Sequence, residues 1–559
     1  MKNKTEIMQP GIKVLALVAA FMGVVILGRM FQIGVLKNVH NTDLVEYAQQ
    51  AETRGSITQA RRGTIFDSQG APIAFDTTSY SIFVVVKDDQ DDSKVMKDAD
   101  VTAKALAKYL DLDRDTILEK LTRPQANQVS FGSAGKNLSA ETKKAIESEQ
   151  LPGVYLVSEA TRRYVNDVYA SHLIGFATAG EKENLLDADV LEGKLGLELA
   201  YDQLLSGKDR PENGVLSGHD LYLTLDSKLQ NPLEEILDRY DAQYQPETLN
   251  AYLVELNSGK LRAAAQRSTF NLNTREGIET EWKNLMVEEA YEPGSTVKIL
   301  TMSVAYDQHL YQPGETYQSG SIQVYDQVVK DYNLVGWGRI SFEEGLARSS
   351  NVAMVNLVNR MGSDKWVQKL AEFGFGQVTD FGLKNENPGQ FKFDNPVSQV
   401  MSGFGQGFSA TPIQMLQAYS AIGNHGKMVK VKVVEGIDQP DYQAQELAAP
   451  ISQQAADHVL DLMVDTVEQP YGTAQSFKNP YVQVAAKTGT AQIASPDGQG
   501  YLTGENDYYH SVVTFFPADN PKYMLYLSMK RPTQTQGLLG SQILGRLFNE
   551  FIGYVVMNP

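Results

Sequence analysis

An apolar run near the N-terminus sets the first limit on how this chain can fold. Residues 14–28 carry no charge, and the apolar character resumes after Arg29. A helix needs about 20 residues to cross the roughly 30 Å core of a bilayer, so a span must include residues on both sides of the uncharged run. We therefore predict a transmembrane span over residues 12–36. Arg29 would then reach towards the membrane interface. No later segment is long enough for a second span.

The charges around this segment predict its orientation. Three lysines precede it and three acidic residues follow it: Lys2, Lys4 and Lys13 before, Asp43, Glu46 and Glu52 after. Positive charge before a first span keeps the N-terminus in the cytoplasm. This predicts a single-pass protein of the cell membrane, with a cytoplasmic tail at 1–11 and the rest outside the cell. A cleaved signal peptide is the alternative, but no small-x-small cleavage site directly follows the run.

The length of the chain predicts more than one folded part. Single hydrophobic cores stop growing near about 250–300 residues, and this chain has 559 residues, of which 42% are apolar and 21% charged. These proportions are typical of globular protein. Because the sequence pattern changes at residues 221–226, we expect one domain over 37–225 and a second over 226–559.

Composition excludes several classes of function. Lys and Arg number 50 against 68 Asp and Glu, and the resulting net charge of −18 repels the phosphate backbone of nucleic acids. The absence of cysteine excludes thiol catalysis, disulfides and cysteine-based metal sites. The seven histidines are scattered, with no pair spaced to place two ligands on one helix face. We therefore predict no metal site and no cofactor.

Hydrophobic patterning indicates an α+β fold. In the N-terminal part we expect a helix at 42–53, a hairpin at 62–72, a strand at 80–87, and helices at 99–122 and 139–149. The C-terminal part has strand patterns at both ends with helical patterns between and after them: strands at 251–255, 261–265, 512–516 and 523–529, helices at 297–305 and around 543–554.

A candidate nucleophile opens the first of these C-terminal helices. Pro293 and Gly294 stand before the apolar run and mark a helix start, which puts Ser295 in the first turn. Lys298 follows three residues later, on the same helix face, within reach of the hydroxyl. A serine needs a base, and a lysine can serve only if burial or nearby positive charge lowers its pKa. Alone, this spacing is common and usually means a capping serine beside a surface lysine.

A second motif lies about fifty residues later. It reads Arg348-Ser349-Ser350-Asn351. Ser349 offers a hydroxyl that can relay a proton to a leaving amine, and Asn351 offers an amide that can hold a substrate peptide. Both are functions that acyl transfer from a serine requires.

A third motif, residues 487–492, stands before the late strands. Lys487 can lower the pKa of Lys298 by like-charge repulsion, while Thr488 and Thr490 can hold a substrate carboxylate. Gly489 lacks a side chain, so substrate can lie along the strand. The three motifs in this order are the pattern of penicillin-binding proteins and class A β-lactamases, where the middle motif is Ser-Asp-Asn. Here the two outer residues stand and a serine replaces the Asp.

With these motifs, the chain resembles a class B penicillin-binding protein, most closely the septal, division-type enzymes of Gram-positive cocci. The resemblance runs through most of the chain, in the stretches 62–67, 196–202, 223–226, 266–271, 291–295, 402–407, 487–492 and 517–521. It implies an elongated pedestal of the penicillin-binding protein dimerisation type over 37–225. It also implies a transpeptidase domain over 226–559, with a five-stranded sheet between helices.

The resemblance also implies an activity. Ser295 would be acylated by a stem pentapeptide ending in D-Ala-D-Ala, and an amine of a neighbouring stem peptide would take the acyl group. Backbone N–H groups of Ser295 and Thr490 would form the oxyanion hole, and Gln492 would contact substrate. β-Lactam antibiotics would block the serine. The implied partners are a polytopic membrane glycosyltransferase and other division proteins.

Two further features allow more than one interpretation. Residues 405–410 fit the dinucleotide pattern G-x-G-x-x-A, but no clear strand precedes them, so we expect a glycine-rich turn beside the active site. Trp337 either lines the substrate groove or anchors a loop by burial.

Two rival functions and one rival setting stay open at this point. Hydrolysis by the same chemistry, as a D,D-carboxypeptidase or β-lactamase, requires a base for deacylation that the sequence does not reveal. A non-catalytic β-lactam sensor or division scaffold is the other possibility, although Ser295, Lys298 and Lys487 are all present. The septal relatives often carry small repeat domains after the transpeptidase domain. This chain stops at Pro559, so a role in elongation also stays open.

Overall fold

The computed structural model describes residues 22, 38–39, 42–43, 59–87, 94–124, 126–180, 190–209, 215–393, 395–495 and 500–558. The predicted tail at 1–11, nearly all of the predicted span at 12–36 and most of the helix expected at 42–53 lie outside these residues. Within 42–53, Thr42–Asp43 form a short strand, β2, which pairs with β1 (Asn38–Val39). No helix in the described ranges combines the length and apolar character needed to cross a membrane.

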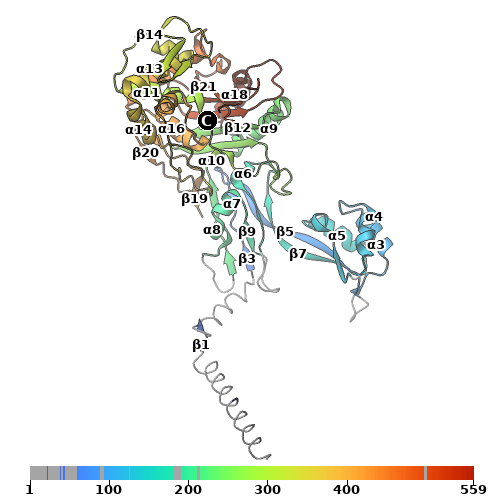
Figure 1. Cartoon of the computed structure of the whole chain (residues 1–559). Coiled ribbons are helices and arrows are strands. Elements are labelled where there is room, and N and C mark those ends of the chain that lie inside the picture. The colour runs from blue at the N-terminus through green and yellow to red at the C-terminus, as the bar shows by residue number, and fades with distance from the viewer. Residues whose placement is uncertain are drawn as a thin grey trace, which may run out of the picture.

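The C-terminal part is built on a five-stranded antiparallel sheet, which confirms the predicted α+β fold (Figure 1). The strand order is β13-β12-β23-β22-β21. The strands are β12 (Thr248–Glu255), β13 (Lys260–Arg267), β21 (Ala485–Gln492), β22 (Tyr508–Phe516) and β23 (Tyr523–Lys530). All four strands expected from the sequence belong to it. β12 is buried on both faces, with Leu249 and Leu253 in one apolar cluster and Tyr252 and Val254 in another.

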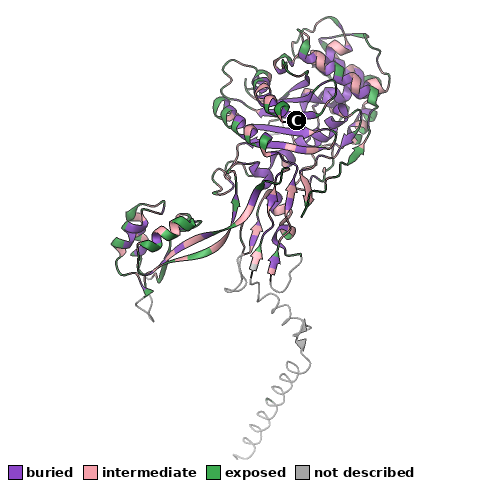
Figure 2. Cartoon of the chain, turned by 180° about the vertical axis from the view of Figure 1, so that it is seen from behind, coloured by how far each residue is buried: buried purple, intermediate pink, exposed green. Residues whose placement is uncertain are grey.

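Helices cover both faces of this sheet (Figures 1 and 2). One face packs against α9 (Ser227–Tyr244) and α18 (Gly540–Met557). The other packs against α11 (Lys298–Asp307), α16 (Pro412–Gly423) and α17 (Gln453–Glu468). Residues 298–305 of α11 are all buried, the polar Lys298, Thr301 and Ser303 included. Its first residue, Lys298, is thus placed in the centre of the domain.

The N-terminal part is a mixed sheet that extends below the C-terminal half (Figure 1). Its order is β19-β11-β4-β5-β6, with β7 on the other edge of β5. The strands are β4 (Ile65–Phe66), β5 (Pro72–Val85), β6 (Gln128–Ser130), β7 (Val154–Tyr164), β11 (Leu221–Leu223) and β19 (Val434–Ile437). β4 and β5 form the hairpin expected at 62–72. β19 comes from the C-terminal half of the chain, so the two halves share one sheet.

A small lobe stands at the far end of the long β5–β7 ribbon (Figure 1). It has its own apolar core, formed by the ribbon tips and three helices: α3 (Ala99–Leu106), α4 (Arg114–Leu121) and α5 (Ala140–Ser148). The helix expected over 99–122 is therefore two helices. Asp113 ends the connection by capping α4, because its carboxylate accepts the backbone N–H of Thr116 at 2.8 Å.

A network of buried charged side chains holds the pedestal together. The pedestal also contains the short elements β3 (Gln59–Arg61), β10 (Val215–Ser217), α7 (Gly196–Ala200) and α8 (Asp202–Ser206). Arg62 and Arg162 both donate to the Glu198 carboxylate, at 2.6 and 2.7 Å. Arg62 also pairs with Asp202 at 2.7 Å, and Arg162 with Asp76 at 2.9 Å. Burial alone would raise the pKa of Glu198, but the two arginines outweigh it and lower that pKa.

Candidate active site

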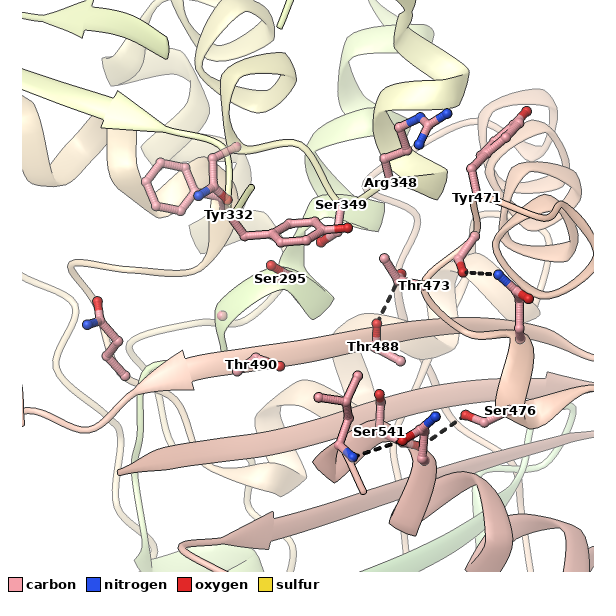
Figure 3. Close-up of a pocket in the computed structure, with 18 of the residues that line it drawn as sticks. Ser295, Tyr332, Arg348, Ser349, Tyr471, Thr473, Ser476, Thr488, Thr490 and Ser541 are labelled. Atoms are coloured by element: carbon pink, nitrogen blue, oxygen red, sulfur yellow. Dashed lines mark hydrogen bonds between the residues drawn. The ribbon is translucent and has the colours of Figure 1, made fainter. Parts of the chain in front are cut away.

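A cleft of about 910 Å³ opens between the start of α11, the start of α13 (Asn351–Met361) and the edge strand β21 (Figure 3). Its lining residues are Gly294, Ser295, Tyr332, Arg348, Ser349, Asn351, Phe404, Gln406, Tyr471, Gly472, Thr473, Gln475, Ser476, Thr488, Thr490, Gln492, Leu539, Ser541 and Gln542. The three motifs singled out in the sequence thus meet at one cleft. Lys298 and Lys487 are fully buried next to it.

Ser295 stands in a 3-10 turn, Gly294–Val297, that leads into α11. The turn packs against the glycine-rich segment that the sequence predicted beside the active site. The backbone N–H of Gly294 donates to the carbonyl of Gly405 at 2.9 Å. Gly405 has a φ of 84°, and an added Cβ there would lie 2.0 Å from the Gly294 carbonyl oxygen. The glycine therefore permits a close backbone approach next to the nucleophile candidate.

Lys298 is hydrogen-bonded to the second motif. Its Nζ donates to the backbone carbonyl of Ser349 at 2.6 Å, to Ser349 Oγ at 3.2 Å and to Asn351 Oδ1 at 2.8 Å. The sequence predicted that this amine would reach the Ser295 hydroxyl, but none of the hydrogen bonds found among the described residues joins those two side chains. The amine is instead held at the start of α13.

Lys487, on strand β21, is hydrogen-bonded to the Ser349 hydroxyl as well. Its Nζ donates to Ser349 Oγ at 3.0 Å and to the Thr488 carbonyl at 2.8 Å. Ser349 Oγ thus contacts both buried amines. Ser349 itself has a φ of 58°, a left-handed conformation that few residues other than glycine adopt. The backbone turn places its side chain between the two lysines.

Both lysines release their protons more easily than an exposed lysine does. Burial lowers the pKa of Lys487 to about 7. Burial also lowers the pKa of Lys298 well below its usual value, and the charge of Lys487 lowers it further, as the sequence suggested. Asp331 acts in the opposite direction and raises it. A neutral amine can accept a proton, so this environment is suited to general-base chemistry.

Strand β21 forms one wall of the cleft. Thr488 donates from Oγ1 to Thr473 Oγ1 at 3.1 Å, whereas Thr490 and Gln492 are exposed on the strand. At Gly489, an added Cβ would lie 2.5 Å from Ser511 Oγ and 3.1 Å from Thr296 Cγ2. The missing side chain thus lets β21 pack closely on the turn that carries Ser295.

At the rim of the cleft, Tyr332, Arg348 and Tyr471 were given no function by the sequence analysis. Tyr332 lies across the cleft in Figure 3, and its ring is 5.6 Å from that of Trp337 in a T-shaped contact. The Arg348 guanidinium stacks over Trp337 at 5.4 Å and over Tyr471 at 4.5 Å. Trp337, predicted either to line the groove or to anchor a loop, is absent from the cleft lining and supports two residues that belong to it.

Within the described ranges, no group of three or more His, Asp or Glu side chains is arranged to hold a metal ion.

Comparison with known proteins agrees with this geometry. Residues 250–552 match the penicillin binding protein transpeptidase domain, and residues 57–217 match the penicillin-binding protein dimerisation domain. The chain is 28% identical to stage V sporulation protein D of Bacillus subtilis, over 94% of this chain and 83% of that protein. It is 25% identical to peptidoglycan D,D-transpeptidase FtsI of Escherichia coli, over 96% and 91% of the two chains.

A solved structure shares the fold. Penicillin binding protein 2X from Streptococcus thermophilus matches with a TM-score of 0.73 and 29% identity, covering 89% of this chain and 80% of that one. The transpeptidase match spans more than half of the present chain. Together with the pedestal match and the three motifs around one cleft, these findings confirm the resemblance inferred from the sequence. The chain belongs to the class B penicillin-binding proteins, the serine D,D-transpeptidases of peptidoglycan synthesis.

Proposed function

We propose that this chain cross-links stem peptides at the division septum through an acyl-enzyme on Ser295. The observation that supports this most is the pair of buried lysines joined through Ser349 Oγ beside the cleft. Such a pair supplies a base and a proton relay next to a serine at a helix start. The similarity to peptidoglycan D,D-transpeptidase FtsI supports the reaction and favours the septal setting.

In the proposed acylation step, neutral Lys298 accepts the proton of the Ser295 hydroxyl while its oxygen attacks the carbonyl carbon of the penultimate D-Ala. The amine must turn from Asn351 towards Ser295 to do so. Backbone N–H groups of Ser295 and Thr490 donate to the oxygen of the tetrahedral intermediate. The bond to the terminal D-Ala then breaks, and its amine takes a proton relayed through Ser349.

The second step transfers the acyl group. An amine from a neighbouring stem peptide attacks the Ser295 ester, an amide bond forms, and the serine recovers its proton. Asn351 and Gln492 would orient the peptide, and Thr488 with Thr490 would hold the donor carboxylate. Gly489 would contribute through the close packing of its strand. These assignments assume that the substrate lies along β21, which Thr490 and Gln492 leave exposed.

The first test is covalent labelling by a β-lactam, whose carbonyl imitates the donor peptide. Full-length protein in detergent is mixed with benzylpenicillin and followed by intact mass and peptide mapping. We expect one long-lived adduct on Ser295, none in Ser295→Ala, and unchanged labelling in the matched Ser363→Ala variant at the start of α14 (Ser363–Glu372). An adduct that disappears within seconds would indicate a hydrolase, and labelling of Ser295→Ala would refute the assignment.

The second test separates transfer from sensing. Protein is mixed with a donor pentapeptide ending in D-Ala-D-Ala and a stem peptide with a free amine, and products are followed by mass. A cross-linked dimer that requires Ser295 supports the transpeptidase. Stable acylation without a dimer would instead support a β-lactam sensor.

The setting in the cell is also part of the proposal. Residues 12–36 would anchor the chain in the cell membrane with its tail at 1–11 in the cytoplasm, and the pedestal would dock a polytopic glycosyltransferase and other division proteins. Support comes from the apolar run and from the absence of a catalytic motif in 60–225. A fluorescent fusion should collect at midcell, whereas an even distribution along the lateral wall would indicate an elongation role. Deleting 60–225 should abolish binding of the glycosyltransferase.

A further inference from the structure

The Ser349–Asn351 motif has no carboxylate in its own middle position, yet a carboxylate lies beside it. Ser350 Oγ donates to Asp331 Oδ1 at 2.8 Å, and both residues are fully buried. Asp331 directly follows strand β16 (Gln327–Lys330). The acid that the Ser-Asp-Asn pattern carries within the motif is therefore supplied here from a different element of the chain.

Asp331 is held by several neutral donors. Its Oδ1 also accepts the backbone N–H of Val352 at 3.1 Å, and its Oδ2 accepts the backbone N–H of Gly320 at 2.8 Å. Nearby, Asn351 Nδ2 donates to the Lys330 carbonyl at 3.0 Å. The end of the hairpin formed by β15 (Ser321–Val324) and β16 is thereby tied to the start of α13.

Two titratable groups on other elements interact with this carboxylate. Lys298 of α11 is affected by it directly, because Asp331 raises the pKa that burial and Lys487 of β21 lower. Tyr317 of β14 (Thr316–Gln318) is the second, and burial raises the pKa of its phenol, so it stays neutral at neutral pH. At Lys298, Asp331 thus offsets the repulsion from Lys487.

We propose that Asp331 is a positioning residue that replaces the missing carboxylate of the second motif: it fixes Ser350 and the start of α13, and it stabilises the protonated form of Lys298. The inference rests on the proposed function, in which neutral Lys298 is the base. It also places Tyr332, the next residue, over the cleft as part of the same anchored segment.

The charge makes a prediction that packing alone does not. In Asp331→Asn, Lys298 loses its nearby negative charge and releases its proton more easily. In a plot of the acylation rate constant against pH, the rising part on the acidic side (the acidic limb) should therefore move to lower pH, by at least about half a pH unit. The maximal rate should fall about tenfold, since the new amide presents a donor to groups that now donate to the carboxylate. A purely structural residue would lower the rate at every pH without moving the limb.

The experiment measures the second-order rate constant for acylation by a fluorescent penicillin from about pH 5 to pH 10. It compares wild-type full-length protein, Asp331→Asn and the matched Asp326→Asn, which removes the same charge from the exposed turn of the hairpin. We expect a shifted limb in Asp331→Asn alone. An unshifted limb in that variant, or the same shift in Asp326→Asn, would overturn the inference. Failure of the wild type to acylate would instead count against the proposed function.

A double variant tests the role of Asp331 even if Asp331→Asn folds poorly. Ser350→Asp/Asp331→Asn moves the carboxylate into the motif and keeps a good residue at the N-cap of α13, where Ser350 now accepts the N–H of Ala353 at 3.0 Å. We expect it to recover most of the lost rate, the unfolding temperature and the wild-type limb. Ser350→Asp alone should be worse than the double variant, because it places two carboxylates together. A double variant no better than Asp331→Asn would overturn the proposal.

Discussion

The pedestal and the active site both bury charged side chains, but they treat them in opposite ways. In the pedestal, the guanidinium groups of Arg62 and Arg162 share the carboxylate of Glu198 at hydrogen-bonding distance. In the active site, every hydrogen bond found for Lys298 and Lys487 in the described structure goes to a neutral hydroxyl, carbonyl or amide oxygen. Charges of the first kind are paired, and those of the second kind are left partly uncompensated.

The difference follows from what each region must do. A guanidinium paired with a carboxylate keeps its charge at any ordinary pH, which suits a fixed joint between strands and helices. A general base must change its charge during the reaction, so its two protonation states must lie close in free energy. Burial without a direct counter-ion brings Lys487 to a pKa of about 7 and lowers that of Lys298. The buried charges of the pedestal are therefore fixed, whereas the buried lysines of the active site can gain and lose protons.

The largest effect that follows from this contrast is on catalysis. Replacing Lys298 by Met should lower the rate constant for β-lactam acylation by about 10³-fold, because a positioned base contributes about 10²–10⁴. The unfolding temperature should change little, since the substitution also removes a buried and poorly compensated charge. Stopped-flow acylation and thermal unfolding measure the two quantities. A large loss of stability with modest loss of rate would show that the lysine holds the fold instead.

Glu198→Gln should lower the stability of the fold and leave the acylation rate unchanged, which is the reverse of the effect expected for Lys298→Met. The amide keeps the shape but leaves Arg62 and Arg162 without their shared charge, so we expect a loss of about 3 kcal/mol in the free energy of unfolding. The acylation rate of the folded fraction should stay unchanged. Urea unfolding and active-site labelling test this.

The partly exposed ion pair between Arg62 and Asp202 in the same network gives the matched control for Glu198→Gln. Asp202 has a side chain 22% exposed, in contrast to the fully buried Glu198. Asp202→Asn should therefore cost about 1 kcal/mol or less, as partly exposed ion pairs generally do. Equal losses from the two substitutions would mean that burial is not what makes the network strong.

The active-site residues could be predicted from the sequence because local spacing fixes much of their geometry. The spacing of Ser295 and Lys298 predicted that both lie at one helix start, and apolar runs predicted the long buried strands β22 and β23. Distances between the motifs could not be derived in this way. The contact of Ser349 with both lysines was not predicted, because Lys298 and Lys487 lie 51 and 138 positions away in the chain and meet Ser349 only through the tertiary fold.

Other features of the fold and of the cleft have no recognisable pattern in the sequence. β19 is four residues long and only partly buried, so nothing in its sequence indicates that it joins the pedestal sheet. Tyr332 reaches the cleft from a loop and Arg348 from the C-cap of α12 (Phe342–Ala347). At such positions no periodicity distinguishes a lining residue from a solvated one. Asp331 becomes notable only when Ser350 is seen to donate to it. Sequence patterns predicted elements that bury a whole face, and they did not predict contacts made by single side chains between elements.

The comparison between the two regions can be sharpened by pH. A buried lysine whose pKa is about 7 in the folded protein and near 10.4 when unfolded binds fewer protons in the folded state between those values. The free energy of unfolding should therefore rise with pH in this window, by about 2 kcal/mol between pH 7 and pH 9 from Lys487. Lys487→Met should lose that increment when urea unfolding is measured at both pH values. Glu198 changes stability in the same direction but in the acidic range: its pKa is lowered on folding, so its contribution is present above its unfolded pKa and is lost on acidification, a loss that Glu198→Gln should not show. If Lys487→Met kept the full alkaline increment, the lysine would already be charged when folded, and the proposed distinction between permanent and exchangeable buried charge would not hold.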